Sequence, residues 1–242
     1  MESEIQLLKQ CIAEGDQAGL MFSTISGRAE LGWYYGFYGA LEKGFEIAEK
    51  ALRLVDEKQQ PAFRAFPLAT IVRLHLMKGD LESAQSIAGP EPLQPAAIPY
   101  VRYTIMVYLA NIELALARTD YEQSLSLVDD LLTLAAPLTR ASIPEVLQHK
   151  ASALIGLNRL DKAHQTLTQA CSLAEEMSSK HHLWSIYLDL ADVNIRLDQP
   201  KRANAFRKKA RLIIEEIAVG LEELGLSQSF LKQPRVRGLM EE

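Results

Sequence analysis

The sequence predicts an all-α protein built from repeated pairs of antiparallel helices. Apolar residues recur at three- and four-residue steps along nearly the whole chain, which is the spacing of amphipathic helices. A short turn phrase recurs about every 40 residues, and prolines fall between the helix pairs that it divides. The chain has 242 residues, of which 48% are apolar and 24% charged, so it can bury an extended core.

The repeat is defined by a turn, a short polar word and a small residue. The phrase GALEKG recurs as GDLESA, TDYEQS, NRLDKA and DQPKRA. The small residues that end the five phrases are Gly44, Ala84, Ser124, Ala163 and Ala203. Successive members of this series lie about 40 residues apart, and self-similarity at a fixed period is the signature of a repeat array.

Each repeat is expected to hold one helix before the phrase and one after it, within a single repeat domain over residues 1–242. The expected parts are a partial repeat at 2–15, full repeats at 18–58, 62–98, 99–140, 143–180 and 182–225, and a capping tail at 226–242. The turns are expected near 38–41, 78–80, 118–120, 157–160 and 197–200. Proline is tolerated in the first turn of a helix but not in its interior. The boundary prolines are Pro61, Pro67, Pro99, Pro137 and Pro144.

Small residues follow one face of the helix after the first turn phrase. Gly44, Ala48 and Ala51 lie at steps of four and three residues, and Gly32 lies on the preceding helix. Glycine in a helix costs about 1 kcal/mol relative to alanine. We expect this cost to be offset by a close crossing of the two helices, where large side chains would force the axes apart.

The residues that carry these patterns resemble tetratricopeptide (TPR) repeats. Leu31-Gly32-Trp33-Tyr34-Tyr35, followed by Gly39, Gly44 and Ala51, matches the TPR pattern, and later copies are degenerate. The period is longer than that of ordinary TPR units, which is roughly 34 residues. It resembles the repeats of bacterial STAND-type signal-transducing ATPases and maltose-activator-like transcription regulators, as does the closing segment SFLKQPRVRGLM at 229–240.

The resemblance implies a right-handed superhelical solenoid of about five helix pairs whose first helices line a concave groove. It also implies a non-catalytic protein-interaction or sensor arm of a larger signalling ATPase or transcription regulator. The expected partner is a protein or peptide, a regulatory ligand or another domain of the same longer chain. A self-contained adaptor or oligomerisation module is the alternative. The partial repeat at the start favours a piece cut from a longer protein, with a natural capping helix as the alternative.

One position in each repeat is expected to point into the groove. Stepping by the repeat from the residue after Gly32 gives Trp33, Arg73, Glu113, Ser152 and Asp192, called the column below. A core position would stay apolar, whereas this column varies, so we expect it to be exposed and to select an extended partner. Trp33 is the expected apolar anchor, with Phe37 beside it, and Arg73 the contact for an acidic group. Packing against a neighbouring helix, or mere solvation, is the alternative.

Four apolar residues lie in the otherwise polar end of the chain. They are Phe230, Leu231, Val236 and Leu239. We expect them to pack back on the last helix pair and to cover its apolar end, because an uncapped repeat stack exposes apolar surface.

The sequence contains no recognisable catalytic constellation. It has no Gly-x-Ser-x-Gly elbow, no His-Glu-x-x-His pair and no phosphate-binding GxxxxGK[ST] loop, so we expect no enzyme activity, cofactor or metal. The adjacent His181 and His182 are expected to point apart on a helix. Cys11 and Cys171 lie in apolar helical patterns and are expected to be buried, reduced thiols of a cytoplasmic protein.

Charge and hydropathy limit the classes of partner. The net charge of about −5 argues against polyanion binding, and the absence of an apolar run of about 18 residues argues against a membrane span. The basic segment 201–211 spreads its charges around a helix, so we interpret it as a solvated outer helix, with a nucleic-acid contact as the less favoured alternative. The segment 89–99, with four prolines, is expected to be a rigid surface loop that joins repeats or reaches over the groove.

Overall fold

The computed structural model describes residues 2–90, 92–94, 101–135 and 140–241. Within these ranges the regular elements are helices and no strand occurs, so the all-α fold class is confirmed. The chain divides into two compact units, Met1–Ala117 (unit 1) and Arg118–Glu242 (unit 2), which are described separately. Of the helices in the described ranges, none has both the length and the apolar character required to cross a bilayer.

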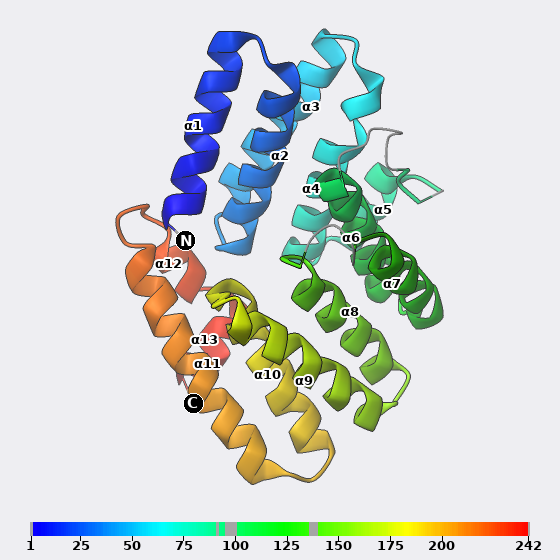
Figure 1. Cartoon of the computed structure of the whole chain (residues 1–242), viewed down its shortest axis with the longest axis vertical. Helices are drawn as coiled ribbons and strands as arrows, with labels where there is room; N and C mark the ends of the chain where they lie inside the picture. Colours follow the sequence, from blue (N-terminus) through cyan, green and yellow to red (C-terminus); the bar gives the residue numbers. More distant parts are fainter. Residues whose placement is uncertain (1, 91, 95–100, 136–139, 242) are drawn as a thin grey trace. The chain divides into compact units, whose positions relative to one another are not determined.

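Unit 1 is built from helical hairpins (Figure 1). Its elements are α1 (Glu2–Ala18), α2 (Met21–Phe37), α3 (Leu41–Glu57), the 3-10 helix η1 (Pro61–Phe63), α4 (Ala65–Lys78), α5 (Leu81–Ala88) and α6 (Val101–Ala117). The helix α2 packs on α3 and α4, and α4 packs on α5 and α6. A core of small and large apolar side chains, including Ala29, Phe66 and Val107, fills the space between these helices.

Unit 2 repeats the same construction and adds two short helices at its end (Figure 1). Its elements are α7 (Tyr121–Ala135), α8 (Ile143–Gly156), α9 (Leu160–Glu176), α10 (Lys180–Arg196), α11 (Pro200–Gly220), α12 (Ser227–Leu231) and α13 (Pro234–Glu241). The hairpins α8–α9 and α10–α11 pack side by side through α9 and α10, and α12 and α13 both contact α11.

Left-handed backbone conformations mark many of the helix ends. Most of them are spaced by half a repeat or by one whole repeat: Gly19, Gly39, Gln59, Gly79, Thr119, Asn158, Ser178 and Asp198. Gly89 and Gly225, which follow α5 and α11, also have positive φ. The helices end there in a closing hydrogen bond, as where the Ala40 N–H donates to the Tyr35 carbonyl at 2.8 Å. Each repeat therefore consists of two helix-and-turn halves, and the five turns predicted from the sequence are confirmed.

The predicted close crossing of α2 and α3 is also confirmed. A Cβ added at Gly44 would lie 2.8 Å from the carbonyl oxygen of Gly32, and one at Gly32 would lie 2.9 Å from that of Gly44. Ala48 and Ala51 are fully buried on the same face of α3. Sequence reasoning missed Gly36, where an added Cβ would lie 2.2 Å from Cδ2 of Leu74. Glycine at that position lets α4 approach α2.

The helix α5 stops at Ala88, directly before the expected 89–99 loop. Beyond it, Leu93 is held by the side chain of Asn111 on α6. The Leu93 N–H donates to Oδ1 of Asn111 at 3.0 Å, and Nδ2 of Asn111 donates to the Leu93 carbonyl at 2.9 Å. Of the predicted 89–99 loop, residues 91 and 95–99 lie outside the described ranges, as does Pro137.

The tail packs back on the last helix pair, as the sequence predicts. Phe230 and Val236 are fully buried and Leu239 is 5% exposed, while Leu231 is half-buried. The ring of Phe230 meets that of Trp184 on α10 edge-to-face, with centroids 5.7 Å apart. These contacts cover apolar surface of α10 and α11, so α12 and α13 form the expected cap.

Two predictions about single residues are wrong. Cys11 is exposed, because it lies beside the inward stripe that contains Ile5 and Ile12 and not within it, whereas Cys171 is buried as expected. The rings of His181 and His182 do not point apart but touch, with centroids 4.0 Å apart. The helix separates their Cβ directions by about 100°, but rotation about the side-chain bonds brings the two rings together.

Candidate partner-binding surfaces

Three members of the column contact one another in unit 1. The guanidinium of Arg73 on α4 lies over the ring of Trp33 on α2, 5.0 Å from its centroid. The same group donates to Glu113 on α6 through Nε at 3.0 Å and Nη2 at 2.7 Å. Equivalent positions of successive first helices are neighbours, since α2 packs on α4 and α4 on α6. Column residues that are one repeat apart in the sequence are therefore in contact in unit 1.

These contacts bury the column in unit 1. Trp33 is 8% exposed and Arg73 is 3% exposed, so the expectation that both are solvent-exposed is wrong. The physical reason is that Arg73 has a carboxylate partner and an aromatic face within its own unit, and paired charges can be buried. Because the Arg73 guanidinium already donates hydrogen bonds to Glu113, fewer of its N–H groups can bind an acidic group of a partner than the sequence suggested.

One turn after Trp33 and Arg73, Phe37 on α2 and Met77 on α4 form an apolar edge. Phe37 stacks on Trp33 with ring centroids 5.1 Å apart and an interplanar angle of 28°, and it remains half-buried. Met77, one repeat beyond Phe37, is 39% exposed. A Cβ added at Gly36 would lie 3.2 Å from the Met77 sulfur, so Met77 lies beside the end of α2. Sequence reasoning missed Met77, although one step of the repeat leads from Phe37 to it.

The column is more polar and more open in unit 2. Ser152 on α8 is half-buried and its hydroxyl donates to the Gln148 carbonyl at 3.1 Å, whereas Asp192 on α10 is exposed. The contact between the two first helices lies one turn away from the column. There Nε2 of Gln148 donates to Oδ2 of Asp189 at 2.5 Å, and the Ser185 hydroxyl donates to Oε1 of Gln148 at 3.2 Å.

The tail supplies the last contact of the column. Arg235 on α13 forms an ion pair with Asp189 and reaches Asp192 at 3.6 Å. Loss of solvation raises the pKa of Asp192, and the Arg235 charge opposes this rise. Sequence reasoning missed Arg235 because it treated the tail only as an apolar cover.

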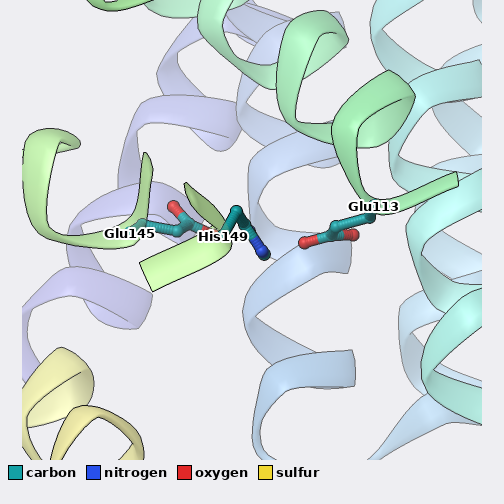
Figure 2. A group of neighbouring side chains, drawn as sticks. All are labelled: Glu113, Glu145 and His149. Carbon is teal, nitrogen blue, oxygen red and sulfur yellow. The ribbon is translucent and has the colours of Figure 1, made fainter. Parts of the chain in front are cut away.

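A histidine is buried where α10 begins. His182 is 6% exposed, and burial lowers its pKa to about 4, with a smaller contribution from His181. Glu145 and His149, which lie one turn apart on α8 (Figure 2), also act on this pKa. A hydrogen bond with the Ala141 backbone acts on it as well. His182 therefore stays neutral near pH 7 and acts as a packed, hydrogen-bonded core residue.

The buried thiol of unit 2 belongs to a polar cluster. Oε1 of Glu175 accepts a hydrogen bond from the Tyr187 hydroxyl at 2.7 Å and from the Cys171 thiol at 3.6 Å. Lys209 lies over the Tyr187 ring, 5.1 Å from its centroid. Burial and the neighbouring carboxylate raise the pKa of Cys171 to about 11. The thiol is the stable form near pH 7, which makes Cys171 a poor nucleophile.

Comparisons with known proteins define the fold class. No protein-family model matches the chain, and neither does any curated protein. Among solved structures, the chain is similar to BtubC (BKLC) from P. vanneervenii with a TM-score of 0.55 and 12% identity, covering 84% of this chain and 92% of that chain. It is also similar to a putative kinesin light chain with nearly identical TPR-like repeats from Podosopora anserina, at a TM-score of 0.47 and 16% identity, over 78% of this chain and 94% of that one.

These likenesses concern the fold alone, because their identities are 12% and 16%. The first of them agrees with the helix-and-turn halves that recur through each unit, and the two observations support one conclusion. The chain is an all-α, TPR-like helical repeat protein.

Proposed function

We propose that this chain is a non-catalytic binding module that recognises a polypeptide through the α2–α4 face of unit 1. The observation that carries the proposal is the apolar edge of Phe37 and Met77 above the Trp33–Arg73–Glu113 contacts. Aromatic rings and methionine are favoured at protein-binding surfaces, because they offer large apolar area and methionine adapts to different partners.

The buried part of the column has a supporting role in this proposal. Trp33 and Arg73 are held by each other and by Glu113, so they form a rigid floor under Phe37. A rigid floor reduces the entropy that is lost when a partner orders the surface side chains. In unit 2, Ser152 and the exposed Asp192 are the polar members of the column, and we include them as contacts for a longer partner.

Peptides selected on the wild-type chain from a random 12-residue library test this proposal. We expect Phe37→Ala to weaken their binding by about 2 kcal/mol, or roughly thirtyfold, as for an aromatic anchor. Met77→Ala should weaken it by a smaller factor. Leu134→Ala is the matched control, because Leu134 on α7 is also 39% exposed and lies outside the surface. Unchanged affinity for both Phe37→Ala and Met77→Ala would place the binding surface elsewhere.

The resemblance to STAND-type ATPases and maltose-activator-like regulators supports a finer proposal. In it the chain is the sensor or partner-binding arm of such a signalling protein and works in the cytoplasm, in line with its two free cysteines. The gene is the test: a reading frame that continues into a nucleotide-binding module supports the arm. A frame without such a module favours the self-contained adaptor or oligomerisation module.

A further inference from the structure

The outward face of α11 carries an apolar stripe. Leu212 is 62% exposed and Val219 is 68% exposed, and Ala205 lies on the same exposed face. Successive members are seven positions apart and differ by about 20° around the helix, so the three span about 40°. The opposite face of α11, with Ala203 and Ile214 fully buried, packs on α10. The stripe therefore points away from the core of unit 2.

The charges beside the stripe are arranged symmetrically about Leu212. Lys208 and Glu216 lie four residues before and after it, and Lys209 and Glu215 lie three residues before and after it. The exposed charges of α11 are therefore basic on its first half and acidic on its second half.

Some of these charges already have exposed partners within unit 2. Glu216 pairs with Lys180 at 2.8 Å, and Lys209 lies 3.7 Å from Glu175, with side chains about half exposed. Exposed pairs of this kind contribute little to stability and rearrange readily. Within the described ranges, Lys208 and Glu215 have no ion pair.

We propose that α11 binds α11 of a second copy of this chain, antiparallel, about a two-fold axis at Leu212. In that arrangement Leu212 meets its counterpart and Ala205 faces Val219 of the other copy. Lys208 of each copy then faces Glu215 of the other, and Lys209 faces Glu216, because residues seven positions apart lie on the same flank of the stripe. A parallel pairing would instead set like charges opposite each other. A two-fold interface uses the same patch on both copies, and this patch is self-complementary.

The size of the stripe sets the expected strength of this interface. Stable complexes bury about 800 Å² on each partner, and one face of a single helix offers less. The dimer is therefore expected to form only at micromolar or higher concentrations. It uses unit 2 alone, so it does not depend on polypeptide binding by unit 1.

Sedimentation equilibrium of the full chain across a concentration series tests the proposal. We expect a monomer–dimer equilibrium that Leu212→Glu abolishes. Leu7→Glu is the matched control and should leave the equilibrium unchanged, because Leu7 on α1 is equally exposed at 62%. Circular dichroism of each variant checks that the helices remain folded.

Charge reversal gives the sharper test. Each Lys208→Glu or Glu215→Lys variant alone should dimerise at least about tenfold more weakly, since the two-fold axis doubles every change. A mixture of these two variants should regain wild-type affinity as a heterodimer, because opposite charges then face each other at both ends. Lys180→Ala, which only frees Glu216 from its partner, should leave dimerisation unchanged. A wild-type monomer at every concentration, or a mixture that stays as weak as its components, would overturn the proposal.

Discussion

The two units use the same repeat period to hold their first helices together, but with different chemistry. In unit 1 the contact is a buried pair, since Arg73 lies between Trp33 and Glu113 and is 3% exposed. In unit 2 the corresponding contact is a part-buried polar network of Gln148, Asp189 and Arg235, in which Arg235 is the exposed member. The difference shows that a repeat fixes which positions meet, whereas the residues at those positions decide how much each contact contributes.

The energetic consequence follows from burial. Removing one partner of a buried pair leaves an uncompensated charge, which costs much more than the pair itself contributes. The Arg235 side chain is 43% exposed, so water can replace a lost partner there. The first helices of unit 1 should therefore depend on one pair, and those of unit 2 on many weak contacts.

The largest expected difference comes from breaking the two contacts. Glu113→Ala should destabilise unit 1 by about 3 to 5 kcal/mol, because it removes the carboxylate that compensates the buried Arg73 charge. Asp189→Ala should cost unit 2 about 1 kcal/mol or less. Denaturant unfolding followed by hydrogen exchange in each unit measures both. The double variant Arg73→Met with Glu113→Leu should regain most of the lost stability, and a Glu113→Ala chain as stable as the parent would contradict the account.

The second test is the pH dependence of stability, because protonation of His182 at low pH should destabilise unit 2. The folded-state pKa of His182 is about 4, below the ordinary value of 6.5, so between these values the unfolded chain binds more protons. The contribution of neutral His182 to the free energy of unfolding is fully present above about pH 6.5. It should fall by about 3 kcal/mol as the pH drops to 4. Hydrogen exchange around α8 and α10 should accelerate over this window. His182→Gln should flatten this dependence, and an unchanged slope would exclude His182 as its source.

The smallest expected effect concerns the small residue that ends each turn phrase. Gly44→Ala in unit 1 should cost about 1 to 3 kcal/mol through overpacking, because its Cβ would lie 2.8 Å from the Gly32 carbonyl oxygen. At the equivalent Ala203 of unit 2, which is fully buried, substitution by glycine should cost about 1 kcal/mol from helix propensity. Thermal melts compare the two, and a stabilised Gly44→Ala chain would show that the crossing can open without cost.

The sequence predicted much of the local structure but little about exposure. The turn phrase located five turns because a helix must stop where its residues favour left-handed or capping conformations. The same logic failed at Cys11, which lies in an apolar pattern but is exposed on the first helix. It failed again for the column. The residue type varies from Trp33 to Asp192, which suggests exposure, but in unit 1 the variation reflects residues that bind one another.

By itself, the sequence determined the all-α fold, the repeat period, the glycine crossing of α2 and α3, and the apolar cap of Phe230 and Val236. These follow from spacing along one chain, which helix geometry converts directly into shared faces. Only the tertiary structure decided that Arg73 is buried between Trp33 and Glu113, that Met77 joins Phe37 at an edge, and that Arg235 reaches Asp189. Such outcomes depend on how side chains from separate helices fill a common space, and no single-helix pattern contains that information.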